Sequence, residues 1–392
     1  MTRKRRSQTA AVRAGIESDA HHGAIVPPIH LSANFAFAGL EQPRTYDYSR
    51  SGNPTRDLLG DALAELEGGA GAVVTATGMA AVTLALMIAE PGERVVAPHD
   101  CYGGTHRLLA ALHRTGRVQV EFVDFTDLGA VARALLPAPR LVWIETPSNP
   151  LLRITDIAAV AALAHAKGAR VVVDNTFLSP VWQRPIDLGA DIVVHSTTKY
   201  LNGHSDVVGG AVVVRDAALL KELEWWGNCL GVTGSPFDSY LTLRGLRSLH
   251  VRMRQHAENA ETIVAALRHH PAISQLHYPG LPEHPGHALA ARQQRAFGAM
   301  IGLELAGGKP AVRRFVDGLA CFSLAESLGG VESLVAHPDT MTHAGMDPAA
   351  RLAAGITPGL LRLSIGIEAV EDLSADLMAA LDRAHGRLSA VG

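Results

Sequence analysis

A lysine follows an apolar, β-branched segment and stands among hydroxyl side chains. The predicted strand at 191–195 leads directly into Ser196, Thr198 and Lys199. A lysine amine can condense with an aldehyde, and hydroxyls beside it can hold a phosphate. Taken alone, this stretch is better explained by an exposed lysine after a buried strand.

A second apolar strand ends in an acid. The segment 170–174 finishes at Asp174, and in a parallel α/β sheet the carboxyl ends of the strands gather ligand groups at one edge. A carboxylate there can hold a pyridinium nitrogen protonated, although an acid in this position can also cap a helix. Asp174 and Lys199 together, with the hydroxyls between them, predict pyridoxal phosphate (PLP) as the cofactor.

A glycine turn supports the same phosphate. A predicted strand at 72–76 passes through Gly78 and Met79 into an alanine-rich helix. Backbone N–H groups at such a turn can face a phosphate at the helix N-terminus. One glycine is weak evidence by itself, but beside Lys199 it makes Gly78 and Met79 candidate cofactor-binding residues.

These stretches carry a family resemblance. The lysine segment resembles that of the Cys/Met-metabolism family of PLP-dependent enzymes, and further matching segments extend over nearly the whole chain: 47–56, 99–104, 203–208 and 325–330. The resemblance implies an α/β fold of the aspartate-aminotransferase-like type (fold type I). It also implies a large, mostly parallel sheet domain and a smaller C-terminal α+β domain.

The resemblance assigns further cofactor residues. Tyr102 matches the aromatic residue that stacks on the cofactor ring and, with Lys199, counts as catalytic. Asn149 can donate to the phenolic oxygen of the cofactor. Tyr48 and Arg50 match residues that bind the cofactor phosphate from a neighbouring subunit.

Six residues are candidates for substrate binding. Arg362 lies in an apolar strand, where an arginine needs an anionic partner. That partner is either a structural Asp or Glu or, as the resemblance implies, the substrate α-carboxylate, which suits a planar fork of donors. The other candidates, each of which could instead be an ordinary exposed or packing residue, are Tyr46, Asp47, Arg107, Glu326 and Ser327.

The resemblance also implies a reaction. PLP-dependent γ-replacement would join L-cysteine to O-succinyl-L-homoserine and release L-cystathionine and succinate. A γ-lyase that cleaves cystathionine shares nearly every cofactor residue, and a sulfhydrylase would use sulfide instead of cysteine. A non-catalytic PLP-binding protein is the alternative from another class, against which the presence of Lys199, Tyr102 and Arg362 argues.

Alternating elements are expected to position these residues. Asn53 and Pro54 predict the start of a helix that ends at Gly68. From about 92 to 215 the periodicity predicts strands at 94–97, 118–123, 140–145, 170–174, 191–195 and 208–214, with helices near 105–115, 127–136 and 156–167. Beyond about 250 it predicts helices near 252–269 and 286–296 and strands near 273–278, 299–305 and 361–367.

The chain is expected to divide at two places. We expect residues 1–55 to form an arm, residues 56–250 to form the PLP-binding α/β domain, and residues 251–392 to form the C-terminal domain. Tyr46, Tyr48 and Arg50 alternate along the arm and so share a face if the chain is extended. The resemblance implies that the arm completes a neighbour's site, in a homotetramer built as a dimer of dimers.

Composition excludes several other classes. A net charge of −3 gives no long-range attraction to nucleic acid or anionic membranes, and no segment reaches the length of a membrane helix. The 3 cysteines have no paired spacing, which indicates a reducing, cytoplasmic location. No histidine or cysteine cluster predicts a metal. The partners expected are small amino-acid substrates.

Overall fold

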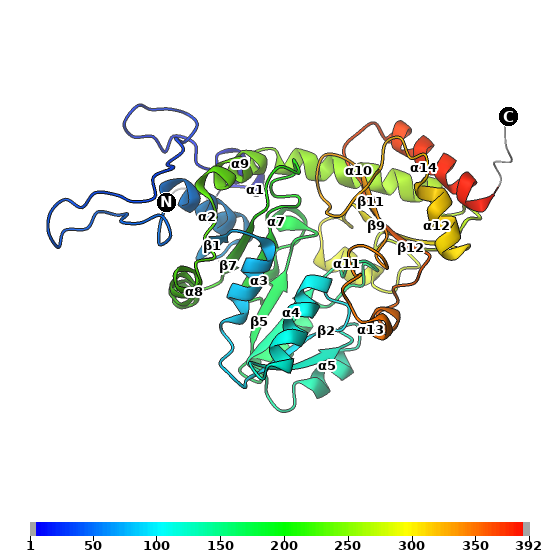
Figure 1. Ribbon diagram of the computed structural model, residues 1–392, viewed down its shortest axis with the longest axis horizontal. Helices are drawn as coiled ribbons and strands as arrows, with labels where there is room; N and C mark the ends of the chain where they lie inside the picture. The colour runs from blue at the N-terminus through cyan, green and yellow to red at the C-terminus, as the bar shows by residue number, and fades with distance from the viewer. Residues whose placement is uncertain (1–4, 387–392) are drawn as a thin grey trace.

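The structure is a computed structural model that describes residues 5–386, and two sheets organise it (Figure 1). In sheet order the larger one comprises β1 (Gly71–Thr75), β7 (Gly210–Val214), β6 (Ile192–Ser196), β5 (Arg170–Asp174), β4 (Leu141–Glu145), β2 (Arg94–Pro98) and β3 (Gln119–Val123). β7 is antiparallel to both of its neighbours, and the other pairs are parallel. The mostly parallel α/β sheet predicted from the sequence is confirmed.

Helices cover both faces of this sheet. One face is covered by α2 (Pro54–Glu67), α5 (Leu128–Ala134), α6 (Ile157–His165), α7 (Ser179–Trp182), the 3-10 helix Pro185–Leu188 and α9 (Pro236–Leu246). The other is covered by α3 (Gly78–Leu86), α4 (Gly103–Arg114) and α8 (Ala217–Leu230). Val171 and Val173 pack on the first face and Val172 on the second. Burial on both faces explains why these strands are continuous apolar runs.

The second sheet belongs to the C-terminal part of the chain. Its strands, in order, are β10 (Ser323–Leu324), β11 (Leu334–Ala336), β12 (Leu360–Ser364), β9 (Met300–Leu305) and β8 (Ile273–His277). The accompanying helices are α10 (Leu249–Leu267), α11 (His287–Gln293), α12 (Gly308–Val316), α13 (Pro348–Ala353) and α14 (Val370–His385). This is the smaller α+β unit that was predicted. The boundary expected at 250/251 falls in the first turn of α10, and the division into domains stays a prediction.

Sequence signals place the helix that joins the arm to the large sheet. Asn53 Oδ1 accepts hydrogen bonds from the backbone N–H groups of Thr55 and Arg56, and Gly68 ends α2 in the left-handed region at φ 80°. Glycine takes that conformation without the strain that a Cβ atom would cause. The predicted bounds of this helix are confirmed.

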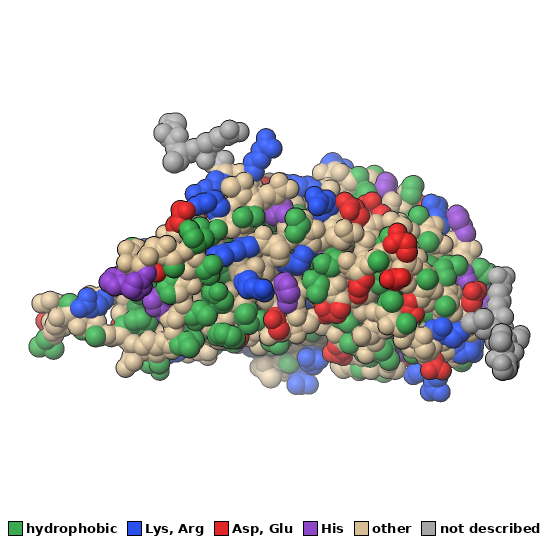
Figure 2. Space-filling model, turned by 90° about the horizontal axis from the view of Figure 1, so that it is seen from above, with side chains coloured by type: hydrophobic (Ala, Val, Ile, Leu, Met, Phe, Trp, Pro, Cys, Tyr) green, Lys and Arg blue, Asp and Glu red, His purple; other side chains and the backbone are tan. Residues whose placement is uncertain are grey.

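The first 55 residues differ in part from the extended arm that was expected. Ser7–Val12 form a short helix, α1, and Ala10 and Ala11 are buried in the main core. Beyond it the chain projects from the body as two loops (Figure 1). Leu40 is 92% exposed and Leu31 69% exposed, and Figure 2 shows apolar side chains on the projecting end. Only the part after α1 is therefore an arm.

Residues 5–386 contain neither a candidate membrane span nor a candidate metal cluster. None of the described helices is long and apolar enough to cross a membrane. Within the same residues, no group of three or more His, Cys, Asp or Glu side chains could hold a metal ion.

Candidate active site

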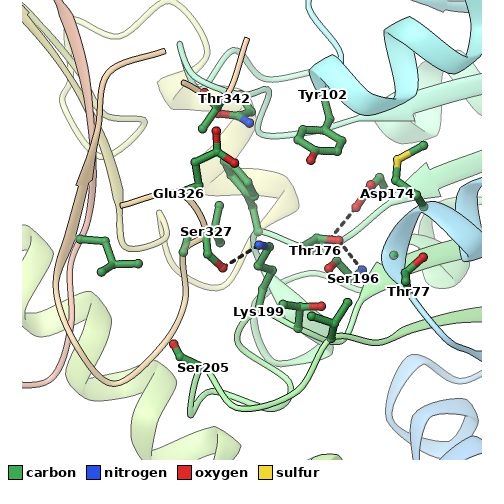
Figure 3. A pocket seen from close by; sticks show the side chains of 18 of the residues that line it. Thr77, Tyr102, Asp174, Thr176, Ser196, Lys199, Ser205, Glu326, Ser327 and Thr342 are labelled. Atoms are coloured by element: carbon green, nitrogen blue, oxygen red, sulfur yellow. Dashed lines mark hydrogen bonds between the residues drawn. The ribbon is translucent and has the colours of Figure 1, made fainter. Parts of the chain in front are cut away.

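A cavity of about 770 Å³ lies where the larger sheet meets the C-terminal unit (Figure 3). Eleven of the predicted site residues line it: Gly78, Met79, Tyr102, Asn149, Asp174, Ser196, Thr198, Lys199, Glu326, Ser327 and Arg362. Five others do not line it, namely Tyr46, Asp47, Tyr48, Arg50 and Arg107. The strand-end groups thus meet at one edge of the sheet, as a parallel sheet requires.

Lys199 is held by a hydroxyl from the other unit. Its Nζ donates to Ser327 Oγ at 2.7 Å. Burial, and then the Arg362 guanidinium, lower the pKa of the Lys199 amine to about 8, while Glu326 opposes this shift. A lysine with a lowered pKa has more of the neutral, nucleophilic amine near pH 7.

Asp174 and Ser196 are tied together by one threonine. Asp174 Oδ1 accepts from the Thr176 N–H at 3.0 Å, and Thr176 Oγ1 accepts from the Ser196 N–H at 2.9 Å (Figure 3). Burial raises the pKa of Asp174, whereas the bonds from Thr176 and the nearby His195 lower it. The sequence analysis missed Thr176, although a residue two positions after an Asp is a usual partner in a local turn.

The start of α3 forms a cradle beside Ser196. Thr77 caps this helix, because its side chain accepts from the Ala80 N–H at 2.9 Å. A Cβ atom on Gly78 would lie 2.7 Å from Ser196 Cβ and 2.8 Å from Ser196 Oγ, so only glycine fits there. Exposed N–H groups at a helix N-terminus and an adjacent hydroxyl suit a phosphate. The cradle therefore fits the phosphate of PLP.

Arg362 on β12 has neutral partners only. The residue is 3% exposed; its Nη1 donates to Asn149 Oδ1 at 3.1 Å and its Nη2 to the Ser327 carbonyl at 2.7 Å. Its buried Nε has no hydrogen-bond partner in the described structure. Burial lowers the pKa of Arg362 to about 10.

One of the two partners considered for Arg362 is absent from the described residues. No ion pair links it to an Asp or Glu among residues 5–386. The structural carboxylate partner is therefore the wrong alternative. A buried cation with a spare donor beside a cavity favours an anionic ligand, because an unpaired buried charge is costly. Asn149 Oδ1 accepts the hydrogen bond from Arg362. The amide nitrogen of Asn149 is therefore the atom that can donate to another group.

Tyr102 and Glu326 both line the cavity. The Tyr102 ring, 41% exposed, points toward the same space as Asp174 and Lys199 (Figure 3). Burial and the Glu326 carboxylate raise the pKa of the Tyr102 phenol, and Arg107 and Arg362 oppose the shift. Arg107 is an exposed residue of α4 whose guanidinium lies against Gly345, outside the cavity lining.

The arm residues lie apart from the cavity of their own chain. Tyr48 is 50% exposed, and the Arg50 guanidinium lies 5.7 Å from the Tyr48 ring centroid and donates to the Asn228 carbonyl on α8. The Asp47 carboxylate accepts from Ser51 Oγ, which lowers its pKa. Tyr46 instead packs its ring at 5.5 Å from that of Phe35. Tyr48 and Arg50 are thus free of the cavity but close to each other.

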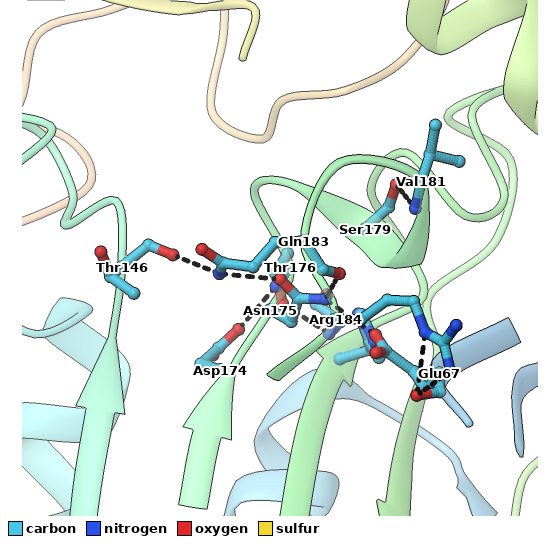
Figure 4. Close-up of polar contacts among 11 residues, drawn as sticks. Glu67, Thr146, Asp174, Asn175, Thr176, Ser179, Val181, Gln183 and Arg184 are labelled. Carbon is cyan, nitrogen blue, oxygen red and sulfur yellow. Dashed lines mark hydrogen bonds and ion pairs between the residues drawn. The ribbon is translucent and has the colours of Figure 1, made fainter. Parts of the chain in front are cut away.

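A buried polar network lies behind the strand ends (Figure 4). Asn175 Nδ2 donates to Glu67 Oε1 at 2.8 Å, and Gln183 Nε2 donates to Asn175 Oδ1 at 3.1 Å and to the Thr146 carbonyl at 3.0 Å. His195 Nε2 lies 2.6 Å from the same Glu67 oxygen. The network joins α2 to the segments after β4 and β5. Its members are far apart in sequence, so no local pattern predicts it.

Comparisons with known proteins agree with this geometry. The family described as Cys/Met metabolism PLP-dependent enzyme matches residues 8–382. The chain is 57% identical to the cystathionine gamma-synthase of Escherichia coli over 96% of this chain and 97% of that protein. It is 44% identical to the cystathionine gamma-lyase of Dictyostelium discoideum over 96% of this chain and 97% of that protein.

A solved structure gives the same result. The cystathionine gamma synthase of Xanthomonas oryzae pv. oryzae in complex with cystathionine is 62% identical and superposes with a TM-score of 0.97. The match covers 98% of this chain and all of that one. The chain belongs to the Cys/Met metabolism family of PLP-dependent enzymes. The predicted family, fold type and cofactor are confirmed.

Proposed function

We propose that this enzyme catalyses a γ-replacement in which L-cysteine and O-succinyl-L-homoserine give L-cystathionine and succinate. The observation that carries the proposal is that one cavity is lined by both the Lys199 amine and the Arg362 guanidinium. The guanidinium is buried and has a nitrogen, Nε, without a partner among the described residues. An amino-acid carboxylate bound at Arg362 lies beside a basic amine. Similarity to two proteins that are named cystathionine gamma synthases supports the choice of substrates.

Seven residues, in addition to Lys199, would hold the cofactor from within the chain. Asp174 would bind the ring nitrogen, Tyr102 would stack on the ring, and Asn149 would donate to the phenolic oxygen. The phosphate would lie between the start of α3, at Gly78 and Met79, and the hydroxyls of Ser196 and Thr198. When bound, PLP supplies a ring that withdraws electrons from the substrate.

The chain's own groups would bind the substrate and move protons. Arg362 would bind the α-carboxylate and fix which bonds of the substrate face Lys199. The Lys199 amine, held until then by Ser327, would take the α-proton and return protons to carbon. In balance, the bond from the γ-carbon to the succinyl oxygen breaks and a carbon–sulfur bond forms. The thiol proton is released with succinate.

Further residues would choose between substrates. Glu326 lines the cavity and would engage the amino group of the incoming cysteine. Arg107 would bind the distal carboxylate of the succinyl group from the rim. Asp47 and Tyr46 lie outside the cavity of their own chain, so a substrate contact from either needs a second chain.

The arm would complete the site of a neighbour. Tyr48 and Arg50 would reach the cofactor phosphate of a second chain, which makes a dimer the smallest active unit. Two such dimers would form a homotetramer. The exposed apolar side chains of the arm, such as Leu31 and Leu40, support this, because an arm that packs on another chain buries them. The cytoplasmic location expected from the unpaired cysteines stays a prediction.

One set of incubations separates the candidate reactions. Purified enzyme is incubated with O-succinyl-L-homoserine together with cysteine, with sulfide or with neither, and in a separate arm with cystathionine alone. Cystathionine, homocysteine and 2-oxobutyrate are measured in every arm. Cystathionine as the main product with cysteine supports the proposal. Main consumption of added cystathionine supports a γ-lyase, homocysteine formation in preference to cystathionine supports a sulfhydrylase, and no turnover of any substrate supports a non-catalytic PLP-binding protein.

A further inference from the structure

Two acids stand side by side in the cavity wall. Glu145 ends β4 and Asp174 ends β5, and the two residues are direct partners in the register of these parallel strands. Paired residues of neighbouring strands point to the same face, and neighbouring strands lie roughly 5 Å apart. Both residues line the cavity. Two carboxyl groups that lie side by side on neighbouring strands, one buried and one partly buried, cannot easily both be ionised.

The surroundings of the two acids differ. Asp174 accepts a hydrogen bond from Thr176 and has His195 nearby, both of which favour its charged form. Glu145 is only 6% exposed and accepts one hydrogen bond, from the Tyr102 N–H to Oε2 at 2.7 Å. The negative charge is therefore better placed on Asp174.

Among residues 5–386, no cation compensates Glu145. The titratable groups that face it are Asp174 on β5 and, from the segment between β2 and α4, Asp100, Cys101 and the Tyr102 phenol. Asp100 is paired with Arg153 at 3.1 Å. The two cations of the cavity donate elsewhere, Lys199 to Ser327 and Arg362 to Asn149 and Ser327. Burial, and then the Asp174 carboxylate, raise the pKa of Glu145 well above its ordinary value.

We propose that Glu145 is a neutral carboxylic acid in the folded enzyme and that it positions Tyr102 through the backbone of that residue. Glu145 Oε2 accepts the hydrogen bond from the backbone N–H of Tyr102, the N-cap residue of α4. This bond fixes the backbone of Tyr102 and therefore the position of its ring, which faces the cavity. Because Glu145 is neutral, it leaves Asp174 as the one negative charge available to the cofactor ring nitrogen. Glu145 is a positioning residue and transfers no proton in the reaction.

Infrared spectroscopy of the apo-protein tests the charge directly. At pH 7 the difference spectrum between the wild-type chain and Glu145→Gln is expected to contain a protonated carboxyl C=O band that shifts in D₂O. Glu326→Gln, which removes an exposed acid of the same cavity, is the matched control and is expected to remove an ionised carboxylate band instead. A carboxylate band lost in Glu145→Gln would overturn the proposal.

Cofactor binding by the apo-protein tests the positioning role. Glu145→Ala leaves the Tyr102 N–H without its acceptor, and we expect PLP affinity to fall about tenfold. Glu145→Gln keeps a neutral oxygen in the same place, so its affinity is expected to remain within about threefold of wild type. Equal loss in the two variants would show that the charge, not the acceptor, matters. If Glu145→Ala does not fold, the infrared band and the affinity of Glu145→Gln still decide the question.

Discussion

The cavity and the arm of this chain differ in how complete they are. In the cavity, Lys199 already donates to Ser327, and Thr176 already ties Asp174 to Ser196. In the arm, Tyr48 is half exposed, and within the described part of the chain the Arg50 side chain donates only to a backbone carbonyl. One chain thus orders the groups for the ring and the amine. Among the described residues, Tyr48 and Arg50 have no comparable set of side-chain contacts.

The difference has a physical reason. Residues of the cavity stand on strands that are buried on both faces, so packing fixes where each strand ends. The arm has a short bridged segment between Asn34 and Tyr48 but little apolar surface buried against its own chain. A segment of this kind gains order mainly from a partner. The following predictions concern the cavity or the arm, in order of decreasing expected effect.

The largest effect is expected in the cavity, at Lys199. Lys199→Ala removes the amine to which we assign two roles, covalent binding of the cofactor and proton transfer. Turnover should fall about 10⁴-fold or more, and the visible absorbance of the lysine-bound cofactor should disappear. Steady-state cystathionine formation and an absorbance spectrum measure both results. Turnover within tenfold of wild type would remove Lys199 from the reaction.

Asp174 should follow in size. Asp174→Asn keeps the shape of the side chain but removes the charge that would stabilise a protonated ring nitrogen. A charge-assisted hydrogen bond of this kind is expected to be worth about a hundredfold in rate. Activity is measured at saturating PLP, so that weaker binding is not mistaken for slower chemistry. An effect smaller than about twofold would show that the assignment is wrong.

The arm should affect retention of the cofactor more than the chemistry. Arg50→Ala removes a guanidinium that would bind the phosphate, and PLP affinity should fall about tenfold or more. Arg44→Ala is the matched control, since Arg44 is an exposed arm cation that donates only to the Ala36 carbonyl. Equal losses in Arg44→Ala and Arg50→Ala would mean that only the total charge of the arm counts.

The environment of Lys199 predicts a pH dependence. Because the pKa of its amine is lowered to about 8, the neutral form is lost as pH falls below that value. The rate at which apo-protein captures PLP should therefore rise about tenfold per pH unit up to about pH 8 and then level off. Capture of PLP by free lysine over the same range is the control for titration of PLP itself. A rise that continues to the ordinary lysine pKa would contradict a desolvated Lys199.

The smallest effect is expected where the arm joins α2. Asn53 caps this helix and donates to the His30 carbonyl, so Asn53→Ala should lower the free energy of unfolding by about 1–2 kcal/mol. Asp127→Ala, which uncaps α5 far from the arm, is the control. Denaturant unfolding of both apo-proteins gives the energies. Asn53→Ala, but not Asp127→Ala, should also weaken PLP retention. An equal loss of PLP retention in Asp127→Ala would show that the Asn53 cap does not act through the arm.

The sequence predicted most of the cavity because its residues stand at the ends of strongly apolar strands. It also predicted α2 from a cap and a terminal glycine. Helices α8, α9, α12 and α14 were not predicted, although α14 buries residues at helical spacing, such as Leu373, Leu377 and Leu381. The sequence analysis missed α1 because alanines give little hydrophobic contrast.

Residues that act through tertiary contacts were harder to predict. Thr176, Glu145 and Glu67 have roles only once neighbouring strands and α2 are in place. The neutral partners of Arg362 were equally beyond the sequence, because Asn149 and Arg362 are 213 positions apart. Local sequence spacing predicts where strands end and which residues cap helices. It does not predict which distant side chain accepts a hydrogen bond from a buried donor.

Complementation is the most direct test of whether the cavity of one chain and the arm of another form a single site. Inactive Lys199→Ala and weakened Arg50→Ala chains are mixed at limiting PLP under conditions that exchange subunits, and exchange is verified by mass labelling. A mixed dimer then has one site with both lesions and one intact site. About a quarter of all sites should be intact after statistical exchange, and activity should rise accordingly. No rise above the unmixed chains, despite proven exchange, would contradict a shared site.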